Sequence, residues 1–152
     1  MAIDDLGRSE AVAALSSIMQ QRKNWPTFVK PFLTHAWPKQ LAYKGEMASR
    51  AFATLLAEAG DDFADAAKVI VPLLRPVSHL DMFSYYMTKD DDEKHDFARR
   101  FPEATLSVLA ALVDENRPTV PYGLPKVLDL IAESDPTLRR KAAWQRLRDL
   151  TF

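Results

Sequence analysis

Residues 25–38, WPTFVKPFLTHAWP, constrain the fold more than any other part of the sequence. Their apolar side chains recur at the spacing of one side of an α-helix, which predicts a helix with a buried stripe. This stripe comprises Trp25, Phe28, Val29, Phe32, Leu33, Ala36 and Trp37. Pro26 suits the first turn of such a helix, where a missing N–H costs nothing, and Pro38 marks its end.

Pro31 falls in the interior of this predicted helix. An interior proline removes a backbone hydrogen bond and clashes with the preceding turn, at a cost of about 3 kcal/mol. The sequence therefore predicts a kinked helix that curves around a core. Pro72 takes a similar place in the helix predicted after Asp61 or Asp62, which we expect to bend and then to end at Pro76.

Further apolar stripes at helical spacing predict helices along the rest of the chain. We expect them near residues 9–23, 47–59, 63–75, 78–86, 94–101, 102–116, 124–131 and 135–150. The expected boundary residues are Asp61 or Asp62 and Asp135 as N-terminal caps, Pro102 and Pro125 in first turns, and Gly60 as a left-handed C-terminal cap. Since no stretch alternates polar and apolar residues as a strand would, the predicted fold is all-α with eight or nine helices. Stripes recur at similar distances from Trp25 to Phe63 and from Phe63 to Phe101, which favours a HEAT- or armadillo-like stack. A compact right-handed α bundle would use the same stripes.

Length and composition predict one domain. The 152 residues are expected to form a frayed N-terminus over residues 1–8 and a single helical domain over residues 9–152. A net charge of −1 argues against a general polyanion binder, so any nucleic-acid site has to be local. The lack of cysteine excludes disulfides and thiolate chemistry and fits a cytoplasmic location. We expect neither a signal peptide nor a membrane span.

No motif for catalysis or cofactor binding stands out in the sequence. The four glycines lie far apart, so no phosphate-binding glycine loop exists. His95 follows Asp91 and Asp92 at helical spacing, but one imidazole and two exposed carboxylates make a poor metal site. We therefore predict no enzyme, no catalytic residue, no metal and no cofactor. A small enzyme that uses His79 or His95 with neighbouring acids is the least favoured alternative.

The last predicted helix carries the strongest surface feature, a set of basic residues around one tryptophan. These candidate residues for binding a partner or nucleic acid are Arg139, Arg140, Lys141, Trp144, Arg146 and Arg148. The cations could hold phosphates while the indole stacks on a base, which makes nucleic-acid binding the main alternative function. We favour a simpler interpretation, in which the cations stabilise a helix C-terminus and the tryptophan packs inward.

Several stretches resemble one group of known proteins: FLTHAWPKQ at residues 32–40, VIVPLLRPV at residues 69–77, and FPEATLSVLAALV and PYGLPKVLDLIAESDPTLRRKAAWQRLRDL towards the end. They resemble the C-terminal, HEAT-like helical region of large bacterial proteins suspected of acting in anti-phage defence. In those proteins the region follows an N-terminal effector module, which is often sirtuin-like, and in some an NTPase core. The resemblance implies a helical interaction domain, and it carries over no catalytic residue because the shared motifs are structural.

Taken together, the sequence predicts a non-enzymatic, cytoplasmic helical-repeat module for assembly or sensing. Its expected partner is a protein or the other domains of a larger protein, and no membrane is involved. A concave or end face of the helical stack would make the contact. Phe83, Tyr85 and Tyr86 are candidates for that contact, although a second core face explains these aromatic residues equally well.

Overall fold

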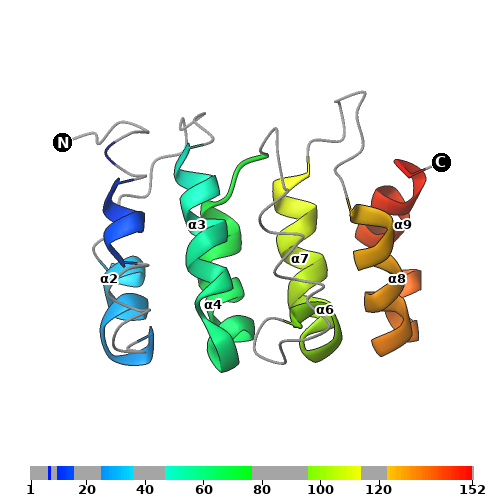
Figure 1. Ribbon diagram of the computed structural model, residues 1–152, viewed down its shortest axis with the longest axis horizontal. Helices are drawn as coiled ribbons and strands as arrows, with labels where there is room; N and C mark the ends of the chain where they lie inside the picture. The colour runs from blue at the N-terminus through cyan, green and yellow to red at the C-terminus, as the bar shows by residue number, and fades with distance from the viewer. Residues whose placement is uncertain are drawn as a thin grey trace. The chain divides into compact units, whose positions relative to one another are not determined.

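The computed structural model describes residues 7, 10–15, 25–35, 47–76, 96–113 and 123–151. The all-α prediction is confirmed for these residues, because 86% of them are helical, in eight helices, and none forms a strand (Figure 1). The chain divides into two compact units, residues 1–75 (unit 1) and 76–152 (unit 2). The single domain over residues 9–152 and the frayed end over residues 1–8 stay predictions.

Unit 1 is organised around one helix, α4 (Phe63–Ile70). The other described elements of this unit are a helix at residues 10–15, the π-helical turn η1 (Trp25–Val29), α2 (Lys30–His35), α3 (Met47–Ala57) and the 3-10 turns η2 (Gly60–Asp62) and η3 (Val71–Leu73). Helix α4 contacts α2, α3, η2 and η3. The largest fully buried side chains of the unit are Trp25, Phe52, Leu55, Leu56, Phe63 and Ile70.

The segment predicted as one kinked helix over residues 25–38 has two geometries in its described part. Residues Trp25–Val29 form the π turn η1, and α2 begins directly after it at Lys30. Pro31 is therefore the second residue of α2. Prolines and π turns are both recognised causes of a local break in α-helical hydrogen bonding. A departure from regular α-helix geometry is thus present near Pro31, where the kink was predicted, and it takes the form of a change from π to α geometry.

The bent helix predicted around Pro72 is instead two elements. Helix α4 ends at Ile70, and Pro72 lies in the 3-10 turn η3. A proline at this position has no N–H to give to the carbonyl of Lys68, so the α pattern stops before it. The buried Leu74 then has an extended backbone with ψ of 151°, and the helix ends earlier than the predicted stop at Pro76.

The backbone N–H of Arg75, which follows η3, is bound by a buried hydroxyl of α3. The Oγ of Ser49, which is fully buried, accepts a hydrogen bond of 2.8 Å from the backbone N–H of Arg75. A buried N–H that finds no partner costs about 1–3 kcal/mol, so this contact stabilises the end of unit 1. At the start of α4, Asp62 occupies the predicted capping position, but its side chain makes no capping hydrogen bond.

Unit 2 is organised around α8 (Leu124–Ser134), which contacts every other described element of the unit. These elements are α6 (Phe97–Arg100), α7 (Pro102–Leu112), the 3-10 turn η5 (Pro136–Arg140) and α9 (Ala142–Asp149). Pro102 begins α7 and Pro125 lies in the first turn of α8, both as predicted. The buried hydroxyl of Thr105 donates to the carbonyl of Phe97 at 3.0 Å and joins α7 to α6.

The helix predicted near residues 135–150 is broken at Lys141. Asp135 caps as predicted, since its carboxylate accepts from the backbone N–H of Thr137 at 3.1 Å, but the capped element is the 3-10 turn η5. Lys141 has an extended backbone with ψ of 134°, and α9 starts after it. The buried side chains of Leu138 and Leu147 belong to different elements. Similarly, α7 ends at Leu112, earlier than the predicted residue 116.

Several parts of the prediction lie outside the described residues, among them the end of the first stripe at residues 36–38, the short helix near residues 78–86 with Phe83, Tyr85 and Tyr86, and His95 with the acidic stretch before it. The same holds for His79. Within the described ranges, none of the helices combines the length and the apolar character that crossing a bilayer requires.

Gly60 provides a test of the backbone between α3 and α4. Its φ of +54° lies in the left-handed region that the sequence predicts for a glycine after a helix, and an added Cβ would meet nothing within 4 Å. We expect Gly60→Ala to lower the free energy of unfolding by about 1 kcal/mol through backbone strain alone. Gly60→Asn should cost less, because asparagine tolerates this conformation. Urea unfolding followed by circular dichroism measures both, and equal losses would contradict the assignment to backbone strain.

Candidate interaction surfaces

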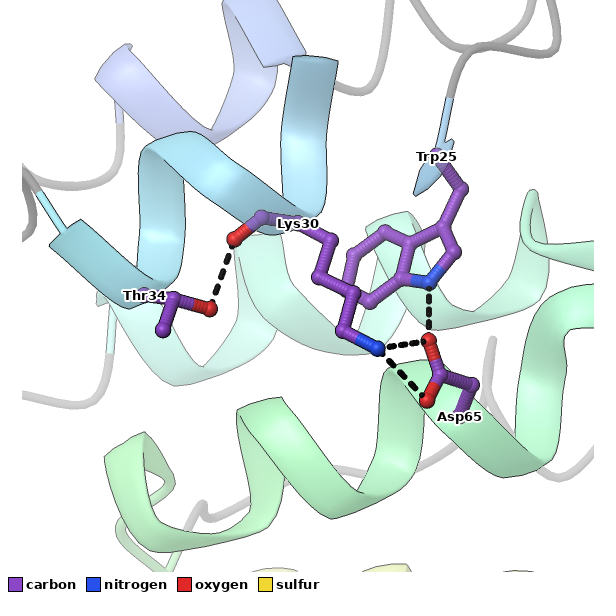
Figure 2. A network of polar contacts seen from close by, with 4 residues as sticks. All are labelled: Trp25, Lys30, Thr34 and Asp65. Carbon is purple, nitrogen blue, oxygen red and sulfur yellow. Dashed lines mark hydrogen bonds and ion pairs between the residues drawn. The ribbon is translucent and has the colours of Figure 1, made fainter. Parts of the chain in front are cut away.

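The carboxylate of Asp65 on α4 joins two side chains of the η1–α2 segment (Figure 2). The indole N–H of Trp25 donates to Oδ2 at 2.8 Å. The Nζ of Lys30 donates to Oδ1 at 3.0 Å and lies 2.9 Å from Oδ2. Trp25 is only 1% exposed, so its N–H is satisfied inside the unit by the one carboxylate. These contacts, together with the buried Val29 and Leu33, hold η1 and α2 against the rest of unit 1.

The same contacts lower the pKa of the Asp65 carboxyl below its ordinary value of 3.8. The hydrogen bond from Trp25 is the largest cause, followed by the one from Lys30, while partial burial acts in the opposite direction. The side chains of Lys30 and Asp65 are 42% and 45% exposed, so water screens their ion pair. An exposed pair of this kind contributes about 0–1 kcal/mol, and the buried indole is therefore the more important partner.

Phe28 and Phe32 form an apolar pair on the outside of η1 and α2, which we call the Phe28–Phe32 face. Phe28 is 46% exposed and Phe32 is 37% exposed. Their ring centroids are 6.4 Å apart and the ring planes differ by 14°, so the two rings stack on each other. The prediction that both belong to the buried stripe is therefore wrong. Of that stripe's described members, Trp25, Val29 and Leu33 are buried.

Little charge surrounds the Phe28–Phe32 face within its own segment. Lys30 is the one lysine or arginine of residues 25–35, and its ammonium group is engaged by Asp65. The hydroxyl of Thr34 donates to the carbonyl of Lys30 at 2.8 Å, which leaves it bound within the helix. His35 is exposed at the end of α2. This segment therefore offers aromatic surface to the solvent with hardly any competing ionic group.

The six residues predicted to bind a partner or nucleic acid do not lie on a single helix. Arg139 and Arg140 belong to η5, Lys141 is the extended residue between the elements, and the remaining three, Trp144, Arg146 and Arg148, belong to α9. The expectation that one helix carries all six residues is wrong in this respect. The break at Lys141 separates the first three cations from the last two.

The side chain of Trp144 contacts α8 within unit 2. Its side chain is half-buried, and its indole N–H donates to the carbonyl of Leu128 on α8 at 3.1 Å. The guanidinium group of Arg148 lies over the ring at 6.0 Å from the centroid. One side of the indole is therefore approached by a cation of the same helix. These contacts agree with the inward-packing interpretation of the tryptophan.

Two of the candidate cations are paired with acids. Arg148 contacts Asp129 at 3.0 Å, and Lys141 lies 3.7 Å from the carboxylate of Glu103. Arg139 and Arg140, in contrast, are exposed and form no ion pair with any described residue. These two arginines of η5 are therefore available to an outside ligand.

The described residues contain no group of three or more histidine, aspartate or glutamate side chains that could hold a metal ion. Comparison of the sequence with protein-family models and with curated proteins, and of the fold with solved structures, gives no match.

Asp65 gives a pH-dependent test of the contact between η1 and α4. We expect Asp65→Asn to lower the free energy of unfolding by about 1 kcal/mol at pH 7, because the variant loses the charged acceptor of Trp25 and Lys30. Because the pKa of Asp65 in the folded state lies below its unfolded-state value of 3.8, the ionised carboxylate stabilises the fold at pH values above 3.8. The difference between wild type and variant should therefore shrink as the pH falls below about 4. Urea unfolding from pH 7 to pH 3 measures it.

Asp129→Asn is the matched control for this measurement. It also removes one carboxylate and one ion pair, but the pair with Arg148 is exposed and involves no buried indole. We expect it to change the free energy of unfolding by less than about 0.5 kcal/mol. A loss for Asp65→Asn that stays constant down to pH 3 would contradict the proposed role of the ionised carboxylate.

Proposed function

We propose that this chain is a non-enzymatic helical interaction module that binds a protein partner through the Phe28–Phe32 face. The observation that carries this proposal is the pair of stacked phenylalanine rings exposed on η1 and α2. Single exposed apolar residues are common on soluble proteins, whereas a contiguous apolar patch is typical of an interaction site. Aromatic side chains also supply much of the binding energy in protein interfaces.

The surroundings of the two rings support the same proposal. The backbone that carries them is attached to α4 through Trp25 and Lys30, so a partner would meet rings that are already positioned. Preorganised side chains lose less conformational entropy on binding. Removing the rings from water would supply about 25 cal/mol for each Å² of apolar area that is buried. A partner with an aliphatic or aromatic surface and few charges fits these features.

The wider setting that we propose follows the sequence resemblance. A HEAT-like helical region of a bacterial anti-phage defence protein would act in the cytoplasm, where it senses or assembles with a protein partner or with other domains. The motifs at residues 32–40 and 69–77 support this setting. The first of these stretches includes Phe32, so the resemblance and the exposed aromatic pair involve the same segment.

The test of the proposal is the double substitution Phe28→Ser/Phe32→Ser. We expect that the variant no longer captures a partner that wild type captures from the native host's lysate. When that partner is purified, its affinity for the variant should be at least about tenfold weaker than for wild type. The fold should be kept, because both rings are partly exposed already. Circular dichroism and thermal unfolding check this point, and quantitative binding measurements compare the affinities.

Thr27→Ala/Thr34→Ala is the control, since it changes two exposed residues of the same segment and keeps both rings. It should bind like wild type. Equal affinity of wild type and the phenylalanine variant for every captured partner would contradict the proposed surface. So would the absence of any captured protein under conditions in which the chain is folded.

Nucleic-acid binding is the second candidate function, and one specific observation favours it. The neighbouring side chains of Arg139 and Arg140 are exposed without an ion pair to the described residues, and arginine is well suited to phosphate contacts. The structure also limits the proposal, since Trp144 is half-buried and the guanidinium group of Arg148 already lies over its ring. We therefore assign the two arginines to phosphate contacts and give the indole no stacking role.

Salt dependence distinguishes this candidate from protein binding. If the arginines contact phosphates, Arg139→Gln/Arg140→Gln should weaken binding to duplex DNA and reduce the slope of log K against log salt by about 2. Lys68→Gln/Lys126→Gln removes two exposed cations elsewhere and should leave that slope nearly unchanged. Fluorescence anisotropy at several salt concentrations measures it. Absence of binding at low salt, or binding that ignores salt, would exclude the candidate.

A further inference from the structure

We draw no further inference here: the strongest candidate, the exposed Phe28–Phe32 face on η1 and α2, belongs to the surface already proposed, and nothing in the described residues shows which partner covers it.

Discussion

The missing N–H of proline sets several of the helix boundaries among the described residues. Pro102 begins α7 and Pro136 begins η5, positions where the absent hydrogen has no intrahelical partner to lose. Pro72 acts in the opposite way, because α4 ends two residues before it. A helix boundary sets which side chains face the core. In α8, Pro125 likewise lies in the first turn, directly after the buried Leu124.

Much of the fold could be predicted because the signals for it are local. The spacing of Leu124, Val127 and Leu128 defines the buried side of α8, and Asp135 was recognisable as a cap. The break at Lys141 had no such signal, since the surrounding residues favour a continuous helix. Its explanation is tertiary: the 3-10 turn and α9 each bury one leucine, Leu138 and Leu147, against the unit. Packing of this kind overrides local propensity.

The candidate site was less predictable because its contacts connect distant parts of the sequence. Trp25 and Asp65 are 40 residues apart, and neither has a neighbour that indicates the other. The sequence singled out the basic residues of the last segment as candidates, but it could not show which of them are paired. Arg148 has an acidic partner on α8, whereas Arg139 has none among the described residues. Such pairing depends on how α8 and α9 pack against each other, and the amino-acid composition carries no information about that packing.

The exposure of Phe28 and Phe32 shows what periodicity leaves open. On a regular helix the apolar residues from position 25 to 33 cover an arc of about 140°. The stripe gives their directions, but only the neighbouring helix decides how much of the arc is covered. Here Trp25, Val29 and Leu33 occupy the covered part and the two phenylalanines the rest. An arc wider than the core of unit 1 covers leaves apolar surface exposed, and this is the surface on which the proposed contact with a partner rests.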